Sequence, residues 1–463
     1  MDKRIFRISL TAALAGFLFG FDTVVISGAN QPIKEIWGTN WFLGDSIFTF
    51  HGIFIMSMAL WGTVLGSLLG GIPTDRLGRK KTLFWIGILY FASAVGSALA
   101  PEAYSFSLFR FIGGVGVGAS SVAAPVYISE ISTAQTRGRL TAMYQFNIVF
   151  GILVAFISNY LIGMIFDESI AWRWMLGIEG LPALIYTIMV FKIPNSPRWL
   201  LMKERADAVV IESITLLGVA RDKATLHLEQ IKIALFETKE EEKGNLFSGK
   251  YKKPLILAFL LAFFNQLSGI NFVLYYAPEI LERAGLASGE SLFSSISIGV
   301  INLIFTFVGI SMIDKLGRKQ LMYIGSIGYI VSLAMVGWCF YSGANSVLLL
   351  TFILIFIASH AVGQGAVIWV FISEIFPNKV RSYGQAWGTG THWVFAALIT
   401  LLTPTFLDAE IGVFKDNPWP IFIFFAFMMV LQLLWVIFMM PETKGITLEE
   451  LGKLLSGKKE KKN

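Results

Sequence analysis

The sequence predicts an all-α polytopic membrane protein in which twelve transmembrane helices form two pseudo-symmetric six-helix bundles. Three observations support this fold class: the composition, the spacing of the apolar runs and an internal duplication. Of the 463 residues, 55% are hydrophobic and 15% are charged, whereas about 25% of a soluble domain is charged. This composition excludes a soluble globular protein, a nucleic-acid-binding protein and a disordered chain. Long unbroken apolar runs also exclude a transmembrane β-barrel.

Each predicted transmembrane helix is an apolar run close to the ~20 residues that span a bilayer. The runs cover residues 6–28, 48–71, 82–100, 104–128, 139–163, 171–192, 254–277, 292–313, 321–341, 347–373, 383–406 and 418–440. The first run follows basic residues, as in a signal peptide, but Asp22 interrupts it and no convincing small-residue cleavage site is present. We therefore predict a retained first helix.

The basic residues gather in the short loops on one side of these helices. Those loops carry Arg76, Arg79, Lys80, Lys81, Arg137, Arg139, Lys315, Arg318, Lys319, Lys379 and Arg381. Because Lys and Arg mark the cytoplasmic side, we expect both termini in the cytoplasm and the chain in the cell inner (plasma) membrane. The net charge of +6 then lies along an anionic lipid leaflet, so it does not indicate a nucleic-acid partner.

Three pairs of short motifs recur about 240 residues apart, which indicates a six-plus-six duplication of the kind found in transporters. The pairs are Asp75–Lys80 with Asp314–Lys319, Ile128–Ile131 with Ile372–Ile375, and Pro194–Ser196 with Pro441–Thr443. Parallel halves with a solute site between them are a transporter architecture. We predict an N-terminal bundle at 1–194, a cytoplasmic helical linker at 195–252, a C-terminal bundle at 253–445 and a cytoplasmic tail at 446–463.

The linker is the only long polar segment of the sequence. It mixes Lys and Glu with recurring apolar pairs such as Val209-Val210 and Leu216-Leu217, a pattern that indicates short amphipathic helices. We interpret it as a brace for the gate described next. A regulatory or partner-binding segment is the alternative.

Carboxylates and guanidinium groups recur at the predicted cytoplasmic helix ends of both halves. They are Asp75, Arg76, Arg79, Glu130, Arg137, Arg139, Asp314, Arg318, Glu374 and Arg381. Such charges can form a network that holds the halves together while the outside is open. Exposed pairs are each worth under ~1 kcal/mol, so the gate would be reversible. Plain positive-inside anchoring of the helices is the alternative.

Five motifs give the sequence a specific resemblance. They are Asp75-Arg-Leu-Gly-Arg-Lys80, Arg137-Gly-Arg139, Pro194-Asn-Ser-Pro-Arg-Trp-Leu200, Gln266-Leu-Ser-Gly-Ile-Asn271 and Pro441-Glu-Thr-Lys-Gly445. In this order they resemble the sugar porter family of the major facilitator superfamily over nearly the whole chain. Their pattern is most similar to bacterial sugar–proton symporters of the xylose–proton symporter type. The resemblance implies the major facilitator fold and the transport of a sugar.

Two charges interrupt the apolar runs. An ionised Asp22 within the first run must be protonated, paired or facing water, and Arg110, near the start of the fourth run, is its natural partner. The proton affinity of Asp22 would then change as the pair opens and closes, whereas a static ion pair is the alternative. The resemblance implies that Asp22 is the proton-coupling residue and that Glu179 matches a further acidic position of the symporters.

A sugar offers hydroxyl groups and apolar C–H faces without charge, so its site should combine neutral polar and aromatic side chains. Carboxamides both donate and accept hydrogen bonds, and an indole packs on a pyranose ring. Such residues within the runs are Gln145, Asn265, Gln266, Asn271, Tyr275, Tyr276, Asn302, Trp369, His392 and Trp393. The resemblance assigns sugar contacts to Gln145, Gln266, Asn271, Asn302 and Trp369. Taken singly, each residue could instead form an interhelical hydrogen bond.

The sequence departs from the family pattern at several positions. Asn265 stands where a second Gln is usual, and His392 replaces a carboxamide. The segment Gly365-Ala366 lacks the usual proline, which predicts a different bend in the tenth run, and Asn195 replaces a customary Glu. The identity of the sugar is therefore open, with substrate choice or pH sensitivity altered at His392.

We predict a proton-coupled monosaccharide symporter, for a hexose or a pentose, that works by alternating access as a monomer in the lipid bilayer. The alternative is an uncoupled facilitative uniporter with the same pocket. A nutrient sensor would usually need a long signalling tail and an enzyme would need a reactive constellation, neither of which we find. The segment Gly113–Gly118 lies within an apolar run and indicates close helix packing rather than a nucleotide loop. No metal-ligand spacing occurs, and nothing indicates a cofactor.

Overall fold

The computed structural model describes residues 3–38, 41, 48–132, 136–239, 246–247, 249–377, 380–446, 451 and 455, and for residues 137–138, 234–239, 250 and 382 it describes the backbone alone. Its named elements within these residues are all helices. Eleven helical spans in the described part are long and apolar enough to cross a membrane, and a shorter apolar helix, Met58–Leu69, lies in the predicted second run. The predicted all-α membrane fold with twelve spans is confirmed.

The chain divides into two compact units. Unit 1 comprises Met1–Thr23, Trp61–Ala155 and Arg173–Glu242, and unit 2 comprises Val24–Leu60, Phe156–Trp172 and Lys243–Asn463. Four of the described helices contribute residues to both units: α1 (Lys3–Trp37), α2 (Met58–Leu69), α6 (Arg137–Ile165) and α7 (Glu168–Gly177). The predicted bundle boundaries at residues 194 and 253 stay predictions.

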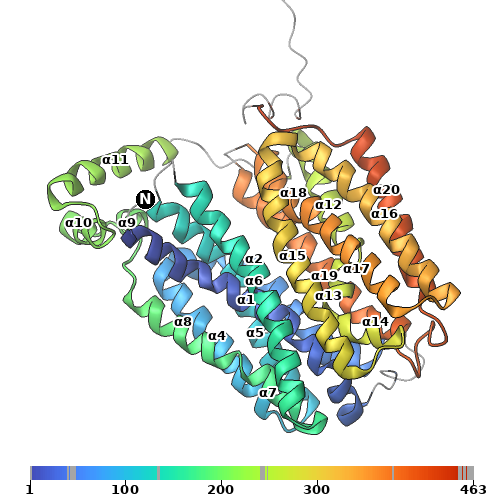
Figure 1. The fold of residues 1–463 in the computed structure, drawn as a ribbon. Coiled ribbons are helices and arrows are strands. Elements are labelled where there is room, and N and C mark those ends of the chain that lie inside the picture. The colour runs from blue at the N-terminus through green and yellow to red at the C-terminus, as the bar shows by residue number, and fades with distance from the viewer. Residues whose placement is uncertain are drawn as a thin grey trace, which may run out of the picture. The chain divides into compact units, whose positions relative to one another are not determined.

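Unit 1 is built mainly from blue to green helices in Figure 1. Besides its parts of α1, α6 and α7, it holds α2 (Met58–Leu69) from Trp61 onward, α3 (Gly71–Arg76), α4 (Arg79–Leu99), α5 (Ala103–Ile131) and α8 (Gly180–Lys192). Small residues such as Ala12 and Ala123 share its apolar core with Tyr90, Tyr127 and Tyr186. The small residues let helices approach closely, and the aromatic rings fill the remaining space.

The predicted linker forms three short helices in unit 1, namely α9 (Pro197–Met202), α10 (Asp207–Leu216) and α11 (Arg221–Lys239). Their amphipathic character is confirmed, because Trp199, Val210 and Leu228 lie in a small apolar core of their own. The indole Nε1 of Trp199 also donates to the Asp75 carbonyl oxygen at 2.9 Å. The linker is thereby attached to α3 at the first gate motif, although its bracing role stays a prediction.

Unit 2 holds η1 (His51–Met56), η2 (Gly249–Tyr251), α12 (Lys252–Gln266), α13 (Ile270–Tyr275), α14 (Ala277–Arg283), α15 (Ser288–Leu316), α16 (Arg318–Ser342), α17 (Ser346–Val362), α18 (Gln364–Glu374), α19 (Arg381–Leu407) and α20 (Trp419–Phe438). Most of these helices are yellow to red in Figure 1. Within unit 2, α16 packs on α17 and α20, and α12 packs on α19.

Three of the spans are interrupted in the middle. Gly269, with φ +82° in the left-handed region, separates α12 from α13, and Glu179 directly precedes α8 after the end of α7. Gly363 separates α17 from α18, and its Cα lies only 2.9 Å from the position that a Cβ on Gly325 of α16 would take. The tenth run thus breaks at a glycine without the usual proline. These breaks interrupt the regular helix in the middle of the three spans.

The predicted glycine packing is confirmed. Gly66 of α2 lies against the backbone of Val115 and Ala119 on α5, and Gly118 of α5 lies against Thr63 and Ser67 of α2. A Cβ at either glycine would overlap the opposite backbone, so the two helices can touch only because both side chains are absent. The run Gly113–Gly118 is part of a continuous helix.

We expect Gly66→Ala to destabilise the protein by about 1–3 kcal/mol, because the added methyl group forces α2 and α5 apart. Thermal unfolding of the purified protein in detergent measures the effect. Gly71→Ala is the matched control, since a Cβ there would meet no atom within 4 Å. Equal melting temperatures for the two variants would contradict the packing argument.

Candidate functional site

The charges buried in unit 1 meet at the middle of α1. Arg110 Nη1 of α5 lies 2.5 Å from Asp22 Oδ1, and its Nη2 donates to the Asp22 carbonyl oxygen at 3.2 Å. Both side chains are 2% exposed. The predicted pair therefore exists as a desolvated ion pair, in which each charge depends on the other because water does not reach them.

Glu179 joins this pair as a second carboxylate. It is buried at the break between α7 and α8, within electrostatic reach of both Asp22 and Arg110. When both carboxylates are ionised, their two negative charges exceed the single positive charge of the guanidinium by one. One proton balances the group, so its chemistry fits reversible proton binding.

The predicted polar residues of unit 2 gather around the break at Gly269. Gln266, the last residue of α12, accepts from Asn271 Nδ2 at 2.9 Å and donates to Asn265 Oδ1 at 3.2 Å. Its Nε2 also lies 3.1 Å from His392 Nε2 of α19. Three carboxamides and an imidazole thus fix one another's positions in the middle of the span.

Aromatic rings flank this amide cluster. His392 lies 5.0 Å from Trp369 of α18 and 4.8 Å from Trp393, measured between ring centroids. Trp369 is 37% exposed, whereas Trp393 is buried. The exposed indole can pack on the C–H face of a polyhydroxylated solute whose hydroxyl groups bind the amides.

The remaining residues predicted for this site lie on α6, α15 and the end of α13. Tyr275 and Tyr276 are buried at the end of α13, and the Tyr276 hydroxyl donates to the Thr400 carbonyl oxygen at 3.0 Å. Asn302 is buried on α15. Gln145 is half-buried on α6 within unit 1.

A second set of predicted residues forms a cluster around Arg79 in unit 1, which we call the Arg79 cluster. The guanidinium binds Glu130 of α5 through two nitrogens, at 2.8 Å from Nη2 and 2.9 Å from Nε. Its Nη1 donates to Asp75 Oδ1 at 3.0 Å. This fork geometry suits Arg and could not be reproduced by Lys.

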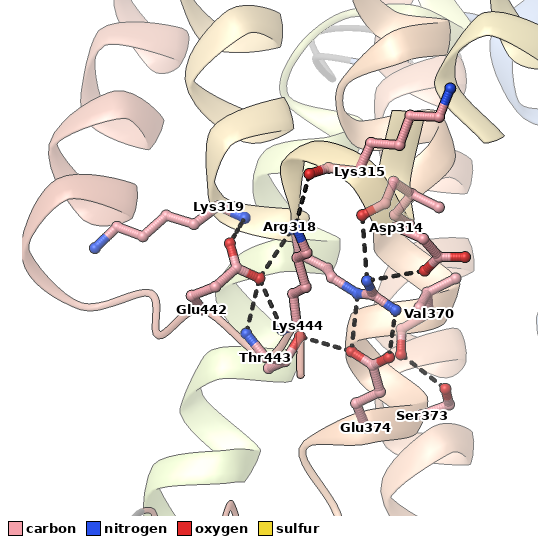
Figure 2. Close-up of polar contacts among 11 residues, drawn as sticks. Asp314, Lys315, Arg318, Lys319, Val370, Ser373, Glu374, Glu442, Thr443 and Lys444 are labelled. Carbon is pink, nitrogen blue, oxygen red and sulfur yellow. Dashed lines mark hydrogen bonds and ion pairs between the residues drawn. The ribbon is translucent and has the colours of Figure 1, made fainter. Parts of the chain in front are cut away.

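Unit 2 repeats this arrangement around Arg318, in what we call the Arg318 cluster (Figure 2). Arg318 Nη2 donates to Glu374 Oε1 at 2.7 Å and Nη1 to Asp314 Oδ1 at 3.2 Å. The same three residue types therefore meet in both halves, as the sequence duplication predicted. Each arginine is mostly buried and pairs with carboxylates of its own unit.

Glu442 and Thr443 extend the Arg318 cluster, although we did not predict them as gate residues. Glu442 accepts from the backbone N–H groups of Arg318 and Lys319 at 3.0 and 2.9 Å, and Thr443 Oγ1 donates to Glu374 at 2.6 Å. Burial opposes ionisation of Glu442, but backbone N–H donors outweigh it and hold its pKa below the ordinary value. The motif Pro441–Gly445 was the available signal, and in the sequence it indicated the duplication and the family resemblance rather than a gate.

The other arginines of the predicted gate differ from these two. Arg76 and Arg139 are exposed, and Arg381 Nε donates to the Phe376 carbonyl oxygen at 3.2 Å. The side chain of Arg137 lies outside the described residues. We therefore place Arg79 and Arg318 at the centres of the two clusters.

The comparisons with known proteins agree on one family. The family model described as "Sugar (and other) transporter" matches residues 8–455. The D-xylose-proton symporter of Escherichia coli (strain K12) is 34% identical over 96% of this chain and 95% of its own length. The arabinose-proton symporter of Bacillus subtilis (strain 168) is 32% identical over 97% and 95%.

A solved structure described as the inward open conformation of the xylose transporter XylE from E. coli has a TM-score of 0.82 to this chain. It is 32% identical, and the match covers 97% of this chain and 99% of that one. A structure described as a major facilitator superfamily proton:xylose symporter, XylE bound to 6-bromo-6-deoxy-D-glucose, matches with a TM-score of 0.78. This chain therefore belongs to the sugar transporter family, with the major facilitator fold, and is a multi-pass membrane transporter rather than an enzyme.

Proposed function

We propose that this protein is a proton-coupled monosaccharide symporter that works by alternating access. The observation that carries the proposal is the buried group of Asp22, Arg110 and Glu179, which needs one proton for neutrality. A facilitative uniporter has no use for such a group, because a neutral residue would avoid the cost of desolvation. The names of relatives support it, since they include xylose-, arabinose- and galactose-proton symporters.

In this proposal the proton weakens the salt bridge between Asp22 of α1 and Arg110 of α5. With Asp22 ionised, Arg110 binds both its carboxylate and its carbonyl oxygen, which fixes the two helices. A proton on Asp22 weakens this contact, and Glu179 can then take over part of the guanidinium's charge compensation. Protonation thus lowers the cost of moving α1 relative to α5.

The sugar binds at the amide cluster of unit 2. Gln266, Asn271 and Asn265 can exchange their mutual hydrogen bonds for bonds to sugar hydroxyl groups, and Trp369 covers an apolar face of the ring. The Arg79 and Arg318 clusters act as a reversible gate at the cytoplasmic side, where both termini lie.

We expect liposomes containing the purified protein to accumulate sugar when an inward proton gradient is imposed. One proton per sugar and a difference of one pH unit allow about tenfold accumulation, because one pH unit corresponds to ~1.4 kcal/mol. Radiolabelled xylose, arabinose, galactose and glucose are the substrates to compare. Uptake that never exceeds equilibrium for any transported sugar would support the uncoupled facilitator instead.

We expect Asp22→Asn to abolish accumulation while sugar exchange at equilibrium continues, because the variant keeps the fold but cannot bind and release the proton. Parallel measurements of gradient-driven uptake and of counterflow separate the two activities. Unchanged accumulation would contradict the role of Asp22. Loss of both activities in a folded variant would show that the pair is a structural requirement.

We expect Gln266→Ala to raise the Kd for the transported sugar about 5- to 150-fold, as loss of a buried hydrogen-bonding group costs ~1–3 kcal/mol. Binding to the purified protein is measured by isothermal titration calorimetry. Asn147→Ala is the control, since this buried amide donates to the Met143 carbonyl oxygen of its own helix. Similar affinities for the two variants would move the sugar site away from the amide cluster.

A further inference from the structure

A second group of buried charges lies in unit 2, at the end of α1. Lys34 Nζ is 2.6 Å from Asp408 Oδ2, which follows α19, and 3.6 Å from Glu279 Oε1 of α14. Glu279 and Asp408 are 5% and 1% exposed. The proposed transport mechanism uses none of these residues, and we call them the Lys34 group.

The two carboxylates of the Lys34 group are held very differently. Asp408 accepts from the backbone N–H groups of Glu410 and Ile411 at 2.7 and 2.9 Å, in addition to its short contact with Lys34. Glu279 has one neutral donor, Asn30 Nδ2 at 2.6 Å, and its distance to Lys34 exceeds a hydrogen bond. The ammonium therefore compensates Asp408, and Glu279 carries the excess negative charge.

Two hydrogen bonds through Asn30 connect Glu279 to a buried histidine. His51 Nε2 lies 2.6 Å from Asn30 Oδ1, and the same amide donates to Glu279 Oε2 through Nδ2. His51 is 2% exposed, and among the described residues its Nδ1 has no hydrogen-bond partner. Because Oε2 is occupied by Asn30, the carboxylate can accept a proton on Oε1, the oxygen that faces Lys34.

We infer that Glu279 is a second proton-binding site and that its protonation locks the end of α1 onto α14 and the end of α19. With the proton bound, one ammonium, one carboxylate and one neutral acid remain, so the buried group is balanced. Without it, Glu279 and Asp408 repel each other, and water must enter to solvate the excess charge. This inference goes beyond the proposed symport and does not depend on the sugar site.

The charges around Glu279 agree with this assignment. Burial raises the pKa of Glu279, the charge of Asp408 adds to this effect, and Lys34 and Asn30 oppose it in part. The pKa of Asp408 is lowered, since Lys34 and backbone N–H groups outweigh its burial. Among the described residues, the charged or titratable groups around Glu279 are Lys34 from α1, Asp408 after α19, Tyr276 directly before α14, and Glu282 and Arg283 within α14. His51 of η1 is connected to Glu279 through Asn30.

The sign of the pH effect follows from the raised pKa. In the locked form Glu279 binds its proton more tightly than in a released, water-exposed form. Low pH therefore favours the locked form, and this stabilisation is lost as the pH rises through the raised pKa. Asp408 acts oppositely, but only below its ordinary value of 3.8.

The test measures whether the end of α1 becomes accessible to solvent. It uses a cysteine introduced at Ile33, a position that is 0% exposed. The native Cys339 is first replaced by Ser. The rate at which a maleimide labels Ile33→Cys is then measured at each pH. Dividing it by the labelling rate of Val347→Cys, an exposed position, gives a relative rate. We expect the relative rate to rise about fivefold or more from pH 5 to pH 8. Glu279→Gln should keep the slow, low-pH rate throughout.

Glu282→Gln is the matched control, because this neighbouring carboxylate binds Ser291 on α15 rather than Lys34. It should keep the pH slope of the parent. A parent without a slope, or a slope that survives Glu279→Gln, would overturn the inference. The labelling needs neither sugar nor a gradient, so failure of gradient-driven uptake would contradict the proposed symport alone.

A second measurement avoids the introduced cysteines. The melting temperature of the protein in detergent should fall relative to that of Glu279→Gln as the pH rises from 5 to 8, because only the wild type loses the locking proton. Melting curves that shift in parallel would contradict the inference. Lys34→Met should lower the melting temperature at pH 8, since it leaves two buried carboxylates without their cation.

Discussion

Burying charge in a membrane protein is the constraint on which the polar architecture depends. An ion taken out of water costs several kcal/mol unless an opposite charge and hydrogen bonds replace the solvent. This chain meets the cost with groups of two carboxylates around one cation. Asp22 and Glu179 surround Arg110, and Glu279 and Asp408 surround Lys34. Each group is one proton short of neutrality, and this charge count is the reason why proton binding is proposed for both.

The Arg79 and Arg318 clusters contain the same residue types at a different depth of burial. Asp75 is 74% exposed and Asp314 is 84% exposed, so water solvates the surplus carboxylate of each cluster. These clusters therefore need no proton to balance their charge. The burial of the second carboxylate distinguishes the two groups that are short of a proton from these two clusters.

The sequence predicted contacts that have a strong local signal. Asp22 and Arg110 stand out because apolar neighbours surround them, and the duplication marked Arg79 with Glu130 and Arg318 with Glu374. It could not predict the Lys34 group, since Lys34, Glu279 and Asp408 lie near the ends of separate helices and read as ordinary loop charges. Gln364 and Gln432, which hydrogen-bond between α18 and α20, were likewise invisible, because facing positions depend on helix packing rather than on spacing. The roles of the predicted site residues stay proposals.

α1 connects the two proton-balanced groups. Asp22 and Lys34 lie on this one helix, which extends from Lys3 to Trp37 and contains Pro32 between them. Because proline has no backbone N–H, the hydrogen-bond ladder of α1 lacks one bond close to Lys34, and the helix can bend there. If the Lys34 group holds its proton, α1 is anchored at that end, and weakening of the Asp22–Arg110 contact frees only the other end.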